Sequence, residues 1–60
     1  MTEVELEKAF LIARTVGTVA PQTTEVEILR VVSEVGEVSV PTWYVADILR
    51  AFREGVAARR

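Results

Sequence analysis

Residues 24–36 read TEVEILRVVSEVG, and whether this segment forms a helix or a strand decides the fold class. Its valines favour a strand, because β-branched side chains lower helix propensity. Ile28, Val32 and Val35 nevertheless recur at the three- and four-residue spacing of one helix face, with Val31 beside them. This spacing predicts a helix over 24–35.

The residues that flank this segment agree with a helix. Thr24 followed by Glu27 is the signature of a capping box, in which a hydroxyl and a carboxylate satisfy free amides of the first turn. Gly36 then predicts the end of the helix, because glycine tolerates the left-handed conformation of a C-terminal cap.

The same signals appear at the start of the chain. Thr2 followed by Glu5 forms another capping-box signature, and Gly17 predicts a stop. Apolar residues recur between them at helical spacing. We therefore expect a first helix over 3–16, with the stripe Leu6, Phe10, Ala13 and Val16.

A third helix is expected over 41–56. Pro41 suits a first helical turn, where its missing N–H is not needed. The alternation before it predicts a short extended stretch at 38–40, and residues 57–60 are expected to fray. The apolar face of this helix contains Val45, Ile48, Leu49, Phe52 and Val56.

These elements predict one all-α domain over 1–60, a three-helix unit with short connections. Its core is expected to combine the inward stripes of all three helices. The predicted core residues are Leu6, Phe10, Ala13, Ile28, Val32, Val35, Val45, Ile48, Leu49 and Phe52.

The composition argues against catalysis. Cysteine and histidine are absent, which removes thiolate chemistry, the commonest general base and zinc sites built from these residues. The three glycines are isolated, so no phosphate-binding loop is recognised. A substrate cleft is not expected between three short helices. We expect no enzyme activity, no cofactor and no metal site.

The apolar runs and charges predict a soluble cytoplasmic protein. The longest apolar run, 9–13, is far shorter than the roughly 20 residues that span a bilayer. The acidic N-terminal segment has the wrong sign for a signal peptide. The chain has no asparagine, one glutamine and six arginines to one lysine, which is a hint of a thermostable protein.

A core of this size supplies only roughly 3–5 kcal/mol, so the chain is expected to be well idealised, oligomeric or docked on a partner. Some apolar residues extend beyond a single helix face, and two aromatic residues are adjacent. We predict an interaction module that forms a homodimer or docks on a larger protein. The predicted interface residues are Leu11, Ile12, Val31, Trp43 and Tyr44.

The distribution of charge is consistent with antiparallel or head-to-tail self-association. Glu3, Glu5 and Glu7 lie near the start of the chain, and arginines lie near its end. The alternative explanation is that these charges complement the dipoles of the terminal helices and aid solubility.

A DNA-binding regulator is the alternative function. Residues 26–49 resemble a helix-turn-helix, and 36–40 resemble the junction that opens many winged-helix domains. Tyr44 departs from that pattern, because a small residue normally stands there. The net charge of −2 and the pI near 5.0 also disfavour phosphate binding. The phosphate contacts of such a dimer would be Arg50, Arg53, Arg59 and Arg60.

Overall fold

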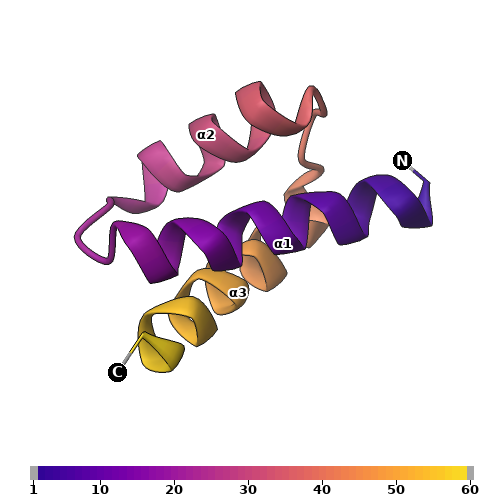
Figure 1. The fold of residues 1–60 in the computed structure, drawn as a ribbon. Helices are drawn as coiled ribbons and strands as arrows, with labels where there is room; N and C mark the ends of the chain where they lie inside the picture. Colours follow the sequence, from indigo (N-terminus) through magenta and orange to yellow (C-terminus); the bar gives the residue numbers. More distant parts are fainter. Residues whose placement is uncertain (1, 60) are drawn as a thin grey trace.

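The computed structural model describes residues 2–59 and forms three α-helices, with no strand among these residues (Figure 1). The helices are α1 (Glu3–Val19), α2 (Glu25–Gly36) and α3 (Val45–Ala58). A 3-10 turn, η1 (Thr42–Tyr44), leads into α3. The prediction of an all-α three-helix unit is confirmed.

The first predicted capping box is present, and the second is half formed. The Thr2 hydroxyl accepts from the Glu5 amide at 3.2 Å, and the Glu5 carboxylate accepts from the Thr2 amide at 2.9 Å. Thr24 accepts from the Glu27 amide at 3.4 Å. The Glu27 carboxylate lies 3.6 Å from the Arg30 guanidinium, so it pairs along the helix and does not return to the cap.

The prediction that Gly17 ends the first helix is wrong, and Gly55 does not end the last one. Helix α1 continues to Val19 and α3 continues to Ala58. A Cβ on Gly17 would overlap the carbonyl oxygen of Phe52, and a Cβ on Gly55 would overlap that of Arg14. Both glycines are needed because the two helix backbones meet there.

Helix α2 ends one residue later than predicted. Gly36 is its last residue and is buried, while Glu37 takes the left-handed conformation with φ 54°. The amide of Val38 then donates to the carbonyl of Ser33 at 3.2 Å. The predicted extended stretch at 38–40 forms no strand, and its two valines, Val38 and Val40, pack on the core.

The third helix differs from the prediction at both ends. Pro41 precedes η1, so the α-helix begins only at Val45. Of the predicted frayed residues, Ala57 and Ala58 belong to α3, and Arg60 lies outside the described residues.

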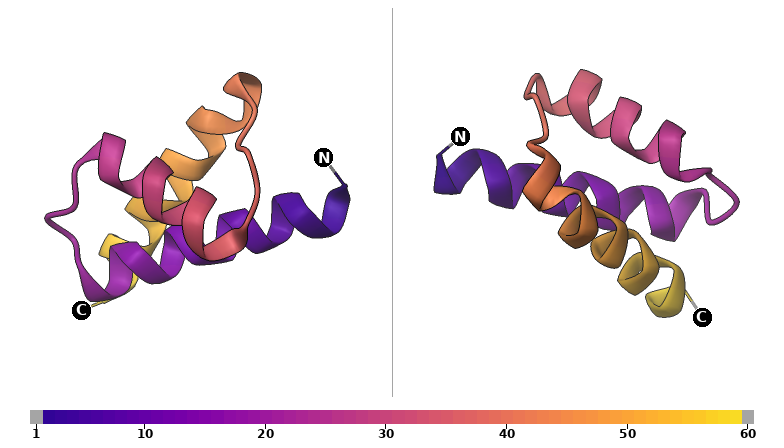
Figure 2. Two further views of the ribbon diagram at one scale, coloured as in Figure 1. Left: turned by 90° about the horizontal axis from the view of Figure 1, so that it is seen from above. Right: turned by 180° about the vertical axis from the view of Figure 1, so that it is seen from behind.

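The core is small and contains three alanines. Helix α1 contacts both other helices, and its contact with α3 is the more extensive, as α3 crosses behind α1 in Figure 1 and runs along it in the rear view of Figure 2. Rows of small residues at four-residue spacing, including Gly17 and Gly55, allow this approach. The fully buried apolar residues are Ala9, Ala13, Ile28, Val32, Ile48 and Ala51.

Most of the predicted core is confirmed, with one error and two omissions. Ala9 and Ala51 are buried but were not predicted. Val35 is 65% exposed, because α2 turns the row Ile28, Val32 and Gly36 inward. The other predicted core residues are buried or partly buried: Leu6, Phe10, Ala13, Ile28, Val32, Val45, Ile48, Leu49 and Phe52.

Candidate interaction surface

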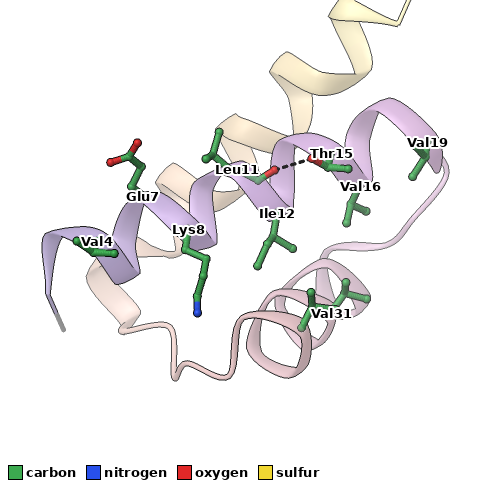
Figure 3. Close-up of a pocket in the computed structure, with 10 residues that line it drawn as sticks. Val4, Glu7, Lys8, Leu11, Ile12, Thr15, Val16, Val19 and Val31 are labelled. Carbon is green, nitrogen blue, oxygen red and sulfur yellow. Dashed lines mark hydrogen bonds between the residues drawn. The ribbon is translucent and has the colours of Figure 1, made fainter.

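An open groove of about 630 Å³ runs between α1 and α2. Its walls are mostly aliphatic, and Figure 3 shows Ile12 and Val16 of α1 on the side toward α2, while Leu11 points away from α2. This volume lies within the usual range for binding pockets, so the expectation of no cleft is wrong. The lining residues are Val4, Glu7, Lys8, Leu11, Ile12, Thr15, Val16, Val19, Val31 and Val35.

Three of the five predicted interface residues meet in this groove. Leu11, at 52% exposed, lies on the outer side of α1, while Ile12 points toward Val31 of α2 (Figure 3). Val4 and Val19 extend the same strip to both ends of α1, and both are largely exposed. The groove and its rim therefore form one continuous apolar face, which we call the α1/α2 face.

The polar residues of the α1/α2 face leave its centre apolar. The Thr15 hydroxyl donates to the Leu11 carbonyl at 2.9 Å, so its hydrogen is used within α1. Glu7 and Lys8 are both exposed and lie toward the N-terminal half of α1 (Figure 3). Charge is thus confined to one part of this face.

Trp43 and Tyr44 do not line the groove, and they point in different directions. The Tyr44 hydroxyl donates to the Leu6 carbonyl at 3.2 Å, which ties η1 to α1. Burial, aided by the Asp47 carboxylate, raises the pKa of Tyr44. Trp43 is 67% exposed, with its ring edge-on to Tyr44 at 5.7 Å between centroids. Tyr44 therefore has a structural role, and only Trp43 is freely displayed.

The three described arginines proposed for DNA contacts, Arg50, Arg53 and Arg59, do not gather on one side of α3. The Arg50 guanidinium lies 2.9 Å from the Asp47 carboxylate, and Arg53 is exposed one turn later. Arg59 donates through Nε to the Thr18 carbonyl at 3.3 Å, so it turns toward α1. Arg60 lies outside the described residues. Among the described residues of this set, only Arg50 and Arg53 are exposed neighbours that could contact a phosphate backbone.

Residues 2–59 offer no other strong candidate for a site. Within them, no three acidic side chains come close enough together to hold a metal ion. No helix among these residues combines the length and apolar character needed to cross a membrane.

Four aliphatic residues of the α1/α2 face were not predicted from the sequence: Val4, Val16, Val19 and Val35. A signal for part of this set was present. Val4, Leu11 and Val19 follow each other at intervals close to two helical turns, so they share one side of α1. That side is distinct from the stripe that packs inward.

Comparisons with protein-family models, with curated proteins and with solved structures find no match to this chain.

Proposed function

We propose that this chain is a small protein-interaction module that forms a homodimer through the α1/α2 face. The observation that carries the proposal is the continuous apolar surface of this face. Scattered exposed aliphatic residues are normal on a monomer, whereas a contiguous apolar patch marks an interaction site. Here Val4, Leu11, Val19 and Val35 are all exposed around one groove.

Burial of the α1/α2 face against a second chain would release enough free energy to offset the cost of association. Burial of one valine or leucine side chain contributes about 1.5–3 kcal/mol when it is complete, and about half of that for these partly exposed residues. Two copies would bury eight such side chains. That gain is comparable with the roughly 4–15 kcal/mol that association costs in lost freedom of motion.

The small core supports a second copy as the partner. Its six fully buried residues include three alanines, which bury little area each. Because a domain of this size holds only roughly 3–5 kcal/mol of stability, a second apolar layer would add substantially to it. A two-fold dimer supplies that layer with the same surface on both partners.

A matched pair of valine substitutions on α2 tests the proposal. Val35 is 65% exposed and lines the groove, whereas Val26 is 75% exposed and lies outside it. Val35→Ser should raise the dimer dissociation constant about tenfold, since two valines per dimer lose burial. Val26→Ser should leave this constant unchanged.

Sedimentation velocity over a concentration series would measure both constants. Equal effects of the two substitutions would contradict the use of this face. A wild-type chain that sediments as a monomer at every concentration would refute self-association and leave docking on a larger protein.

A further inference from the structure

We infer that the dimer is antiparallel, with α1 packed against α1 of the second copy about a two-fold axis near Leu11 and Ile12. This inference rests on the proposed function and specifies its geometry. It is carried by the spacing of the α1 residues on the α1/α2 face and by the charges along the edge of that face.

The apolar positions of α1 match themselves when the helix is reversed. Leu11 and Ile12 stand at the centre of the strip, and Val4 and Val19 stand at equal distances on either side. An antiparallel pair therefore places Val4 of one copy against Val19 of the other at both ends. This is the self-complementary arrangement that a two-fold interface requires.

The charges along the edge of the strip also complement one another when the helix is reversed. Glu7 and Arg14 are seven residues apart, nearly two helical turns, so they lie along the same edge of α1. Both are exposed, and the ion pairs found within residues 2–59 involve only Arg30 and Arg50 as cations. Their charges are therefore available to a partner.

Reversal of the helix brings opposite charges together twice. Glu7 of each copy comes within one turn of Arg14 of the second copy, on the same edge of the interface. A parallel two-fold pair would instead hold this edge of the two copies on opposite sides of the interface, so Glu7 of one copy would meet neither residue of the other. The charge pattern therefore selects the antiparallel arrangement.

Opposite charges also come close at the two ends of this edge. Glu3 of one copy comes within one turn of Thr18 of the second copy, and the Thr18 carbonyl accepts from Arg59 Nε at 3.3 Å. The acidic start of each chain thus meets a basic group near the end of the other. The antiparallel pair therefore accounts for the acidic start and the arginine-rich end of the sequence.

Disulfide trapping tests the geometry, because the chain has no cysteine of its own. Val4→Cys and Val19→Cys change exposed residues and should leave the fold intact. The variants are prepared reduced, then oxidised separately and as a mixture. We expect a covalent dimer in the mixture, joining one chain of each kind, and little from either variant alone.

The reason is distance. In an antiparallel dimer the two copies of position 4 are about 22 Å apart, from a rise of 1.5 Å per residue, while positions 4 and 19 are adjacent. Efficient trapping of Val4→Cys with itself would overturn the antiparallel geometry. So would a dimer, established by sedimentation, in which the mixture does not cross-link. Monomeric wild-type protein would instead refute the proposed function.

Charge reversal provides an independent measurement. Glu7→Arg and Arg14→Glu should each weaken the dimer on the order of tenfold, since two attractive pairs become repulsive. The double variant should recover wild-type affinity. Single variants with unchanged affinity would contradict the pairing, because unchanged affinity is what a parallel dimer, with these edges on opposite sides of its interface, would give. Circular dichroism would verify that each variant remains helical.

Discussion

Addition of one methyl group at the crossing of α1 and α3 should strongly destabilise this protein. Gly17→Ala would place a Cβ on the carbonyl oxygen of Phe52, and 3.0 Å from the Val56 amide nitrogen. Gly55→Ala would place one on the carbonyl oxygen of Arg14, and 3.1 Å from the Thr18 amide nitrogen. These are backbone atoms, so the helices must separate to relieve the overlap.

The overlap outweighs the gain in helix propensity. Replacing glycine with alanine inside a helix contributes about 1 kcal/mol, whereas overpacking of this kind costs about 1–3 kcal/mol or more and here also loosens the alanine contacts. We expect a net loss near 2 kcal/mol for each variant, a large part of the total stability. The thermal midpoint should fall by about 8–16 °C.

Gly36→Ala is the matched control for these substitutions. Its Cβ would lie 3.1 Å from Ile12 Cδ1 and 3.4 Å from Val38 Cγ2, which are the ends of side chains that can shift. Thermal unfolding by circular dichroism should show this variant equal to wild type or more stable. If Gly17→Ala and Gly55→Ala matched it, the close crossing of the two backbones would be refuted.

Three further predictions concern individual polar side chains. Hydrogen bonds from Thr2 lower the pKa of Glu5 below its ordinary value of 4.5. The ionised carboxylate therefore stabilises the fold above pH 4.5, and this stabilisation is lost as the pH falls through the lowered pKa. Glu5→Gln keeps the acceptor but removes this dependence, so its difference in thermal midpoint from wild type should shrink below pH 4.5; a constant difference would contradict the cap. Tyr44→Phe removes the hydroxyl that donates to the Leu6 carbonyl and should cost about 1 kcal/mol in chemical denaturation. Because the pKa of Tyr44 is raised, wild-type stability should decline as pH rises above 10 and that of the phenylalanine variant should not. Arg50→Ala combined with Arg53→Ala should leave self-association unchanged, since both residues lie outside the groove; salt-sensitive binding of duplex DNA that this double variant abolishes would support the nucleic-acid alternative.

The sequence predicts the helices well because their signals are local. The Thr2 cap and the apolar spacing of Ile28 and Val32 depend only on neighbours within a few residues, and both predictions are confirmed. Glycine is ambiguous, because the same residue serves at a helix end or at a close helix crossing. The four-residue row of Ala9, Ala13 and Gly17 was the available sign of a crossing.

The candidate surface was harder to predict than the fold. Leu11, Ile12 and Val31 were identified because they extend beyond one helix face, and they do line the groove. Val35 was assigned to the core because one helical turn allows either Val35 or Gly36 to face inward. Only the tertiary contact of Gly36 with Ile12 decides between them. The role of Tyr44 likewise depends on a carbonyl thirty-eight residues away.

The central claim is that the α1/α2 face is buried against a second copy of the chain. Light scattering behind size-exclusion chromatography, at a high and a low protein concentration, measures this directly through the molar mass. We expect twice the 6.7 kDa of one chain at both concentrations. A folded protein that retains the mass of a single chain at both concentrations would contradict it.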